Sequence, residues 1–134
     1  MTDGSDRDAV LQAFSAYSLA LDRHEWPRLA QAFAPDGVWI LADGGSYDGL
    51  AAITERARYG AARSPADRLH QVFNVFVSFD GDAATAESDW LYYGAVAGKP
   101  WGIVSFGHYE DRLIRTPDGW RFASRKIVRR IEYE

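Results

Sequence analysis

The first half of the chain carries its hydrophobic residues at helical spacing, and the second half carries them in alternation. Over residues 6–22, one arc of a helical wheel collects the positions that face a core: Val10, Leu11, Phe14, Tyr17, Ser18 and Leu21. This spacing predicts an amphipathic helix. The stripe ends at Asp22, where the helix dipole is mildly unfavourable for a negative charge. Asp22 is therefore either a solvated turn residue or a residue whose charge the fold requires.

The pattern after Asp22 predicts two more helices and one early strand. Pro27 suits the first turn of a second helix, which the segment APDG (34–37) ends in a turn. Residues 38–41 (VWIL) are typical of a strand, and a loop follows them. A third helix is expected over residues 49–64, with Glu55, Arg56 and Arg63 on its exposed face.

Beyond Pro65 the pattern changes to period two, with many aromatic and β-branched residues. Four long antiparallel strands are expected over residues 69–80, 84–96, 101–115 and 120–133. Helices followed by a run of strands indicate the α+β class. A length of 134 residues favours a single domain spanning residues 1–134, with residues 1–6 polar and frayed.

Composition narrows the classes of function. The formal net charge is −4 and the basic residues are dispersed, which argues against a nucleic-acid partner. A basic group near the end, Arg125, Lys126, Arg129 and Arg130, is expected on a solvated strand face. No apolar run has membrane-spanning length and no signal peptide opens the chain, so a cytoplasmic protein without a membrane partner is expected. The chain has no cysteine, and its histidines are not spaced to join one another in a metal site.

The aromatic share of 14% suits a curved sheet that encloses a cavity. On the strand from residue 69, one face mixes polar and apolar side chains: His70, Val72, Asn74, Phe76 and Ser78. That mixture is typical of a ligand pocket, although a solvated face is an equal alternative. The opposite face is strongly apolar, with Phe73, Val75, Val77 and Phe79. This face predicts a homodimer that packs through the outside of the sheet.

Asp22 and His70 can form a carboxylate–imidazole pair, in which the carboxylate fixes the tautomer and leaves the other ring nitrogen as a general base. Of the other two histidines, His24 lies in a polar turn and is expected to be exposed. His108 is equally compatible with a pocket and with the surface.

Several segments together resemble the SnoaL-like members of the nuclear transport factor 2-like superfamily. They are YSLALDRHEWPRLAQAFAPDGVW, YDGLAAI, LHQVFNV, GDAATAES and GHYEDRLIRTPDGWRFASRKI, and the match runs over about residues 6–130. The resemblance implies an α+β cone, a strongly curved antiparallel sheet wrapped around a pocket, with three helices in the N-terminal half. Within the superfamily the chain is similar to scytalone dehydratase, bile acid 7α-dehydratase and hexachlorocyclohexane dehydrochlorinase.

The resemblance also implies roles for residues. Asp22 and His70 fall on the positions of an aspartate that orients a catalytic histidine, and Tyr17 matches a catalytic tyrosine of the bile acid enzyme. Asn74 corresponds to a polar residue of the same strand in the dehydrochlorinase. The chain departs from scytalone dehydratase at Leu21 and Leu41, where that enzyme has tyrosines. Three residues are candidates for the general acid: Tyr17, and Asp89 and Tyr92 of the strand expected over residues 84–96.

These features lead to an expected cofactor-free lyase or isomerase that acts on a small hydrophobic, cyclic molecule. The reaction class is proton abstraction followed by elimination, a double-bond shift or cyclisation. The ketosteroid isomerase and epoxide hydrolase subtypes match less well, since the first leaves His70 without a role. A binding or dimerisation module without catalysis is the alternative. Candidate pocket walls are Trp39, Phe76, Trp90, Tyr92 and Phe106, with His108 beside them.

Overall fold

The computed structural model describes residues 4–133 and has the expected α+β architecture. The helices are α1 (Gly4–Arg23), the short 3-10 helix η1 (Trp26–Gln31) and α2 (Leu50–Ala61). The strands are β1 (Phe33–Ile40), β2 (Ser46–Asp48), β3 (Leu69–Asp80), β4 (Ala83–Gly94), β5 (Gly102–Thr116) and β6 (Gly119–Glu132). Helix α1 begins at Gly4, inside the segment expected to be frayed, and residues 1–3 lie outside the described residues.

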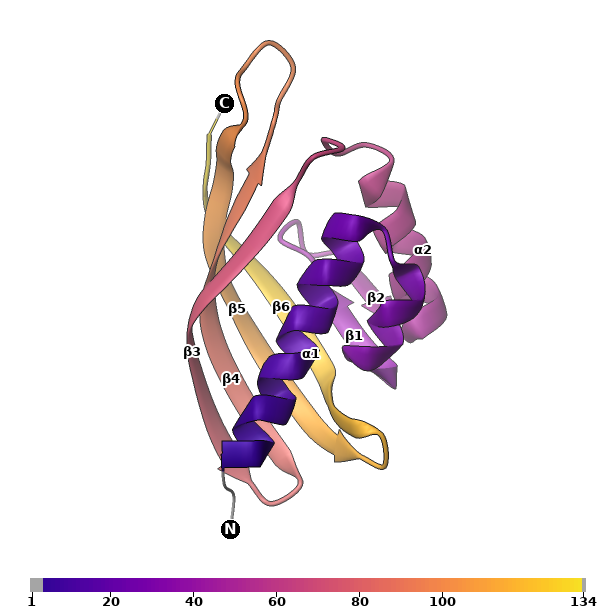
Figure 1. Ribbon diagram of the computed structural model, residues 1–134. Helices are drawn as coiled ribbons and strands as arrows, with labels where there is room; N and C mark the ends of the chain where they lie inside the picture. Colours follow the sequence, from indigo (N-terminus) through magenta and orange to yellow (C-terminus); the bar gives the residue numbers. More distant parts are fainter. Residues whose placement is uncertain (1–3, 134) are drawn as a thin grey trace.

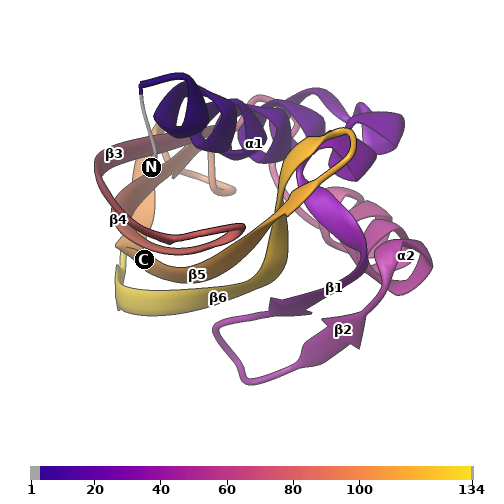
Figure 2. The same ribbon diagram turned by 90° about the horizontal axis from the view of Figure 1, so that it is seen from below.

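One six-stranded sheet, in the order β2-β1-β6-β5-β4-β3, forms the body of the molecule. Every neighbouring pair is antiparallel except β1 and β6, which run parallel. The sheet curves strongly, α1 lies across its concave side, and α2 lies beside β1 and β2 (Figures 1 and 2). No helix within residues 4–133 combines the length and apolar character that crossing a membrane requires.

The segment between α1 and α2 differs from the expected pattern. The second helix is a single 3-10 segment, and the APDG turn lies inside β1, where a register shift separates Phe33 from Val38. Gly37 lets the backbone of β1 pass close to that of β6 at this shift, because a Cβ there would lie 3.0 Å from the carbonyl oxygens of Ala34 and Phe122. The loop that follows also contains the short strand β2. The sequence predicted the part of β1 over residues 38–40, but it did not indicate residues 33–37 or β2, since these segments depend on pairing within the sheet.

The concave face of the sheet packs against α1 through aromatic rings. Phe14 of α1 meets Phe122 of β6 edge to face, with ring centroids 5.2 Å apart, and Tyr17 lies 6.1 Å from Phe33. All four side chains are almost fully buried. Burial of side chains of this size contributes about 1.5–3 kcal/mol each, so the predicted apolar arc of α1 is the main attachment of this helix to the sheet.

A β-bulge in β3 overturns the predicted division of that strand into two faces. Phe73 pairs with Asp89 and Phe76 pairs with Glu87, so two residues, Asn74 and Val75, oppose the single residue between those partners. Asn74 has a left-handed backbone with φ 54°, which asparagine tolerates better than most residues. The extra residue exchanges the faces of everything after it.

The exchange moves three of the four residues that were predicted on the outer face to the inside of the sheet. Val75, Val77 and Phe79 are partly buried against the core, and Phe79 meets the Trp120 ring edge to face. Phe76 turns outward with 66% of its surface exposed, so its predicted place in the pocket wall is wrong. A strict period-two reading could not detect this, because a bulge adds one residue without leaving a clear mark in composition.

Candidate functional site

A cavity of about 220 Å³ lies between the concave face of the sheet and the two helices, next to the end of α1. Strands β1, β4 and β5 supply aromatic walls, and α2 supplies small residues: Trp39, Trp90, Tyr92, Tyr109, Ala57, Gly60 and Ala61. Three of the predicted wall residues, Trp39, Trp90 and Tyr92, are therefore in place. Mostly apolar walls with a few polar groups are typical of sites for small organic molecules.

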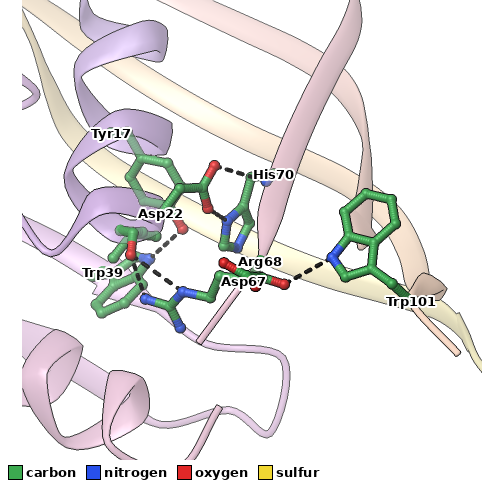
Figure 3. A network of polar contacts seen from close by, with 8 residues as sticks. Tyr17, Asp22, Trp39, Asp67, Arg68, His70 and Trp101 are labelled. Carbon is green, nitrogen blue, oxygen red and sulfur yellow. Dashed lines mark hydrogen bonds and ion pairs between the residues drawn. The ribbon is translucent and has the colours of Figure 1, made fainter. Parts of the chain in front are cut away.

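Asp22 and His70 meet at the edge of this cavity and make two hydrogen bonds (Figure 3). The backbone N–H of His70 donates to Oδ2 of Asp22 at 2.9 Å, and ring Nδ1 lies 2.5 Å from Oδ1. The side chains are 17% exposed for His70 and 8% for Asp22. Because the backbone bond holds one carboxylate oxygen, the other is fixed beside Nδ1. The ring therefore lines the cavity with Nδ1 occupied and Nε2 available.

The way in which α1 ends explains how Asp22 is held in place. His24 has a left-handed backbone with φ 56°, and the N–H of Glu25 donates to the carbonyl oxygen of Ala20 at 3.0 Å. This six-to-one bond is the mark of a Schellman cap. The Leu21 carbonyl, in the last turn of α1, accepts a hydrogen bond from Nε of Arg68 at 3.2 Å. Figure 3 shows Arg68 reaching from the start of β3 back to this helix end.

The position of Arg68 also answers the electrostatic question that the sequence raised. A carboxylate near the C-terminal end of a helix is disfavoured by the dipole. Here a guanidinium caps that same end, and the N–H of His70 stabilises the carboxylate directly. The fold thus offsets the unfavourable location of Asp22 with one positive charge and one backbone donor.

Tyr17 lies five residues before Asp22 in α1, and its buried side chain lines the cavity. Its hydroxyl oxygen accepts a hydrogen bond from Nε1 of Trp39 at 3.2 Å, and its ring centroid is 6.5 Å from that of His70. Burial raises the pKa of Tyr17, although the charge of Arg125 and hydrogen bonds with Trp39 and Tyr109 act in the opposite direction. Burial also raises the pKa of Tyr109 well above its ordinary value. Both phenols are therefore protonated at neutral pH.

Arg125 is completely buried beneath these tyrosines, which contradicts its expected place on a solvated strand face. Its guanidinium makes two hydrogen bonds of 2.9 Å to Asp111, and the rings of Tyr109, Phe122, Tyr17 and Phe14 surround it at 3.8–4.7 Å. Burial alone would lower the pKa of Arg125, but Asp111 and the two tyrosines outweigh that effect and the pKa is raised. A bulge in β6 causes the difference: Arg112 pairs with Ser124 but Leu113 pairs with Phe122, so the face changes just before Arg125.

The remaining predicted site residues lie away from the cavity. Asn74 donates from Nδ2 to Asp89 at 2.9 Å on the exposed side of the sheet. His108, left open between pocket and surface, contacts Glu110 at 3.2 Å on that side. Phe106 lies there as well, its ring near that of Tyr133. Asn74, Asp89, Phe106 and His108 are thus not cavity residues, because the bulge and the strand register turn them outward.

Sequence reasoning missed several residues that line the cavity. Tyr109 and Ser105 alternate with the outward His108 and Phe106, so the correct facing of β5 would have indicated them. Arg56 was placed on an exposed helix face, and Arg68 comes just before a strand where no periodic pattern applies. Within residues 4–133, no group of three or more His, Asp or Glu side chains is arranged to hold a metal ion.

Comparison with known proteins identifies the family. The model of the SnoaL-like domain matches residues 3–126. The chain belongs to the SnoaL-like family. A relative in Mycobacterium tuberculosis, the uncharacterized protein Rv2910c, is 30% identical to this SnoaL-like protein over 129 residues, which cover 96% of the chain and 84% of the relative.

Solved structures agree with this assignment of the fold. The hexachlorocyclohexane dehydrochlorinase LinA-type3 of Novosphingobium barchaimii superposes with a TM-score of 0.85 at 20% identity, over 96% of this chain and 89% of that one. An NTF2-like protein of Novosphingobium aromaticivorans superposes with a TM-score of 0.78 at 24% identity, over 91% and 80%. At these identities the likeness concerns the fold, and the expected nuclear transport factor 2-like architecture is confirmed.

Proposed function

We propose that this SnoaL-like protein is a cofactor-free lyase or isomerase that removes a proton from a small cyclic molecule with a large apolar surface. The observation that carries the proposal is the Asp22–His70 pair, which is joined by two hydrogen bonds. Nε2 of His70 takes no part in these bonds and is available at the wall of an apolar cavity. A surface pair of the same residues would have no enclosed substrate, and a cavity without the pair would have no positioned base.

His70 acts as the general base in this proposal. Its Nδ1–H donates to Asp22, so the lone pair of Nε2 can accept a proton from a carbon of the substrate. The electrons of the broken C–H bond then form a double bond. In an elimination, the bond to the leaving group breaks and its electron pair departs with that group. In an isomerisation, the double bond shifts and the imidazolium returns the proton to a different carbon. The Asp22 carboxylate stabilises the imidazolium during either reaction.

Tyr17 is the proposed hydrogen-bond donor or acid to the oxygen that departs or enolises. Its oxygen accepts from Trp39, so its own O–H remains available for donation, and its raised pKa keeps that proton in place. Asp89, an alternative acid, lies outside the cavity, whereas Tyr92 lines it and pairs with His70 across the strands. Tyr17 therefore has the stronger support of the two tyrosines, because it is hydrogen-bonded in place at the cavity.

The ring tautomer of His70 provides a test that needs no substrate. The backbone N–H of His70 can only donate, so in Asp22→Asn its acceptor must be the oxygen of the asparagine amide. The NH₂ group of that amide then faces Nδ1. Nδ1 must then accept, and the ring proton moves to Nε2. Long-range ¹H–¹⁵N correlation should show an Nδ1–H tautomer in the wild type and an Nε2–H tautomer in the variant. The same tautomer in both proteins would contradict the proposal and favour a binding module without catalysis.

The predicted homodimer remains a proposal, and we place its interface at the apolar residues that point outward from the sheet in the structure. Phe76 and Phe73 of β3 are 66% and 38% exposed, and Ile131 of β6 is 46% exposed. A second copy of the sheet would cover these side chains. Sedimentation velocity of the wild type and of Phe76→Glu measures the association, and a wild type that is monomeric at micromolar concentration contradicts it.

A further inference from the structure

The charged side chains at the cavity are all of one sign. Arg56 of α2, Arg68 before β3 and Arg129 of β6 line it together with His70, and no aspartate or glutamate does so among the residues that the structure describes. Asp22 lies behind His70, and both of its oxygens are already bonded. Three arginines line this one cavity, although the net charge of the chain is −4.

The existing contacts leave the charges of Arg56 and Arg129 largely uncompensated, whereas Arg68 also offsets the charge of Asp22. Arg56 lies over the rings of Tyr47 and Tyr59 at 5.7 and 5.2 Å and has no acidic partner among residues 4–133. Arg68 donates to a neutral carbonyl oxygen at the end of α1. Arg129 is 3.9 Å from Glu132, in a pair whose side chains are 46% and 59% exposed, and such a pair is weak.

One glycine lets a guanidinium lie directly on the cavity wall. Gly60 lines the cavity one turn after Arg56, and a Cβ at Gly60 would lie 2.9 Å from Nη1 of Arg56. The missing side chain therefore leaves room for the charged group beside Ala57 and Ala61, which make the same wall apolar. This arrangement places the charge of Arg56 beside an apolar part of the cavity wall.

We infer that the ligand of this cavity is an organic anion: an apolar ring system that carries a carboxylate or a phosphate monoester. The inference rests on the proposed function, because it names the class of substrate for the same site. The ring lies against Trp39, Trp90 and Tyr92, and the anionic group lies toward Arg56, Arg68 and Arg129. Guanidinium groups bind carboxylate and phosphate oxygens through paired N–H donors, which gives them both affinity and orientation.

Three probes of similar shape test this inference: β-naphthoate, β-naphthyl phosphate and the neutral β-naphthamide. Their binding is followed by the indole N–H signals of ¹⁵N-labelled protein. Trp39 and Trp90 line the cavity, whereas Trp101 lies outside it and donates to the carbonyl oxygen of Asp67, so Trp101 serves as an internal control.

We expect at least one anion to bind about tenfold more tightly than the amide. The anion that binds more tightly identifies the carboxylate or the phosphate class. Its affinity should fall as NaCl rises from about 0.05 to about 0.5 M, while that of the amide stays constant. An amide that binds as tightly as both anions overturns the inference, and so does the absence of any shift at Trp39 and Trp90 with either anion.

Matched variants locate the charges responsible. Arg56→Gln and Arg129→Gln should each weaken the anion several-fold and leave the amide unchanged. Arg58→Gln on the exposed side of α2 and Arg130→Gln on the outer side of β6 are the controls, since neither residue lines the cavity. Equal losses in the controls would contradict the inference. The tautomer of His70 is measured without ligand, so a failure here is distinguishable from a failure of the proposed function.

Discussion

The pairs Asp22–His70 and Asp111–Arg125 both lie on the concave side of the sheet, and they differ in access to the cavity. Asp22–His70 lies at the cavity wall with part of the imidazole exposed. Asp111–Arg125 has both side chains fully buried and is enclosed by four aromatic rings. The first pair contains an imidazole, whose ring nitrogen can serve as a general base, whereas arginine keeps its proton at any physiological pH.

The comparison separates chemistry from architecture. In the proposed function a proton moves between a substrate and His70, so the charge of that pair changes during the reaction. Arg125 keeps a constant charge, and its two parallel hydrogen bonds to Asp111 hold in place the guanidinium on which the rings of Tyr17 and Tyr109 lie. Removal of one partner should therefore lower mainly turnover for the first pair and mainly the free energy of unfolding for the second.

Breaking the first pair should produce the largest effect, and it should appear in turnover. Asp22→Asn is expected to reduce turnover roughly 10²–10⁴-fold, the scale of general-base catalysis, because the ring presents a proton in place of a lone pair. His70→Ala should cost about as much, and the double variant little more, since the two residues act as a unit. Steady-state kinetics with a substrate of the anionic class measures this. Full additivity in the double variant would contradict the joint role.

Breaking the second pair should act on stability. Asp111→Ala leaves a buried guanidinium whose Nη1 already lacks a hydrogen-bond partner, so we expect a loss of about 3–5 kcal/mol in the free energy of unfolding. The melting temperature should fall by roughly 10 °C or more. Urea unfolding and calorimetry measure both quantities, and Asp118→Ala, which removes an exposed carboxylate, is the control.

Removing both partners of the second pair sharpens the result. Asp111→Leu with Arg125→Met replaces the ions by apolar groups of similar length and should cost much less than Asp111→Ala alone. A double variant that is as unstable as the single one would mean that the ion pair itself, rather than the stranded charge, holds the tyrosines in place.

The smallest expected effect concerns alkaline pH and the phenols between the two pairs. An unfolded chain ionises tyrosine near 10.0, whereas burial raises the pKa of Tyr17 and Tyr109 in the fold. Above that pH the folded state binds more protons than the unfolded state, so stability falls as pH rises. We expect a loss on the order of 1 kcal/mol between about pH 9.5 and 10.5. Tyr17→Phe should reduce this slope by about half, and an unchanged slope would contradict the assignment.

The prediction from sequence succeeded where a signal is local or spans the whole chain. The apolar arc from Val10 to Leu21 predicted α1, and the alternation after Pro65 predicted the four long strands. The α+β class and the SnoaL-like resemblance followed from the order of these elements and their motifs, and both are confirmed. Hydrophobic periodicity specifies elements of this length strongly, because each must bury one face.

Prediction failed where a single extra residue in a strand reversed the side of the sheet to which the following side chains point. The bulge at Asn74 moved Phe76 outward and Val75 inward, and the bulge before Arg125 moved that charge from the expected surface into the core. Both errors have one physical cause: side chains alternate with period two, so one inserted residue reverses every later assignment.

The sequence by itself determined the class of fold, the candidate base His70 and its candidate partner Asp22, because these depend on element order and on residue types at matching motif positions. Only the tertiary structure decided which side chains share the cavity. Arg56, Arg68 and Arg129 come from a helix, a loop end and the last strand, and no local pattern relates them. Their common location results from the curvature and pairing of the sheet, which bring distant residues together through contacts that no short segment encodes.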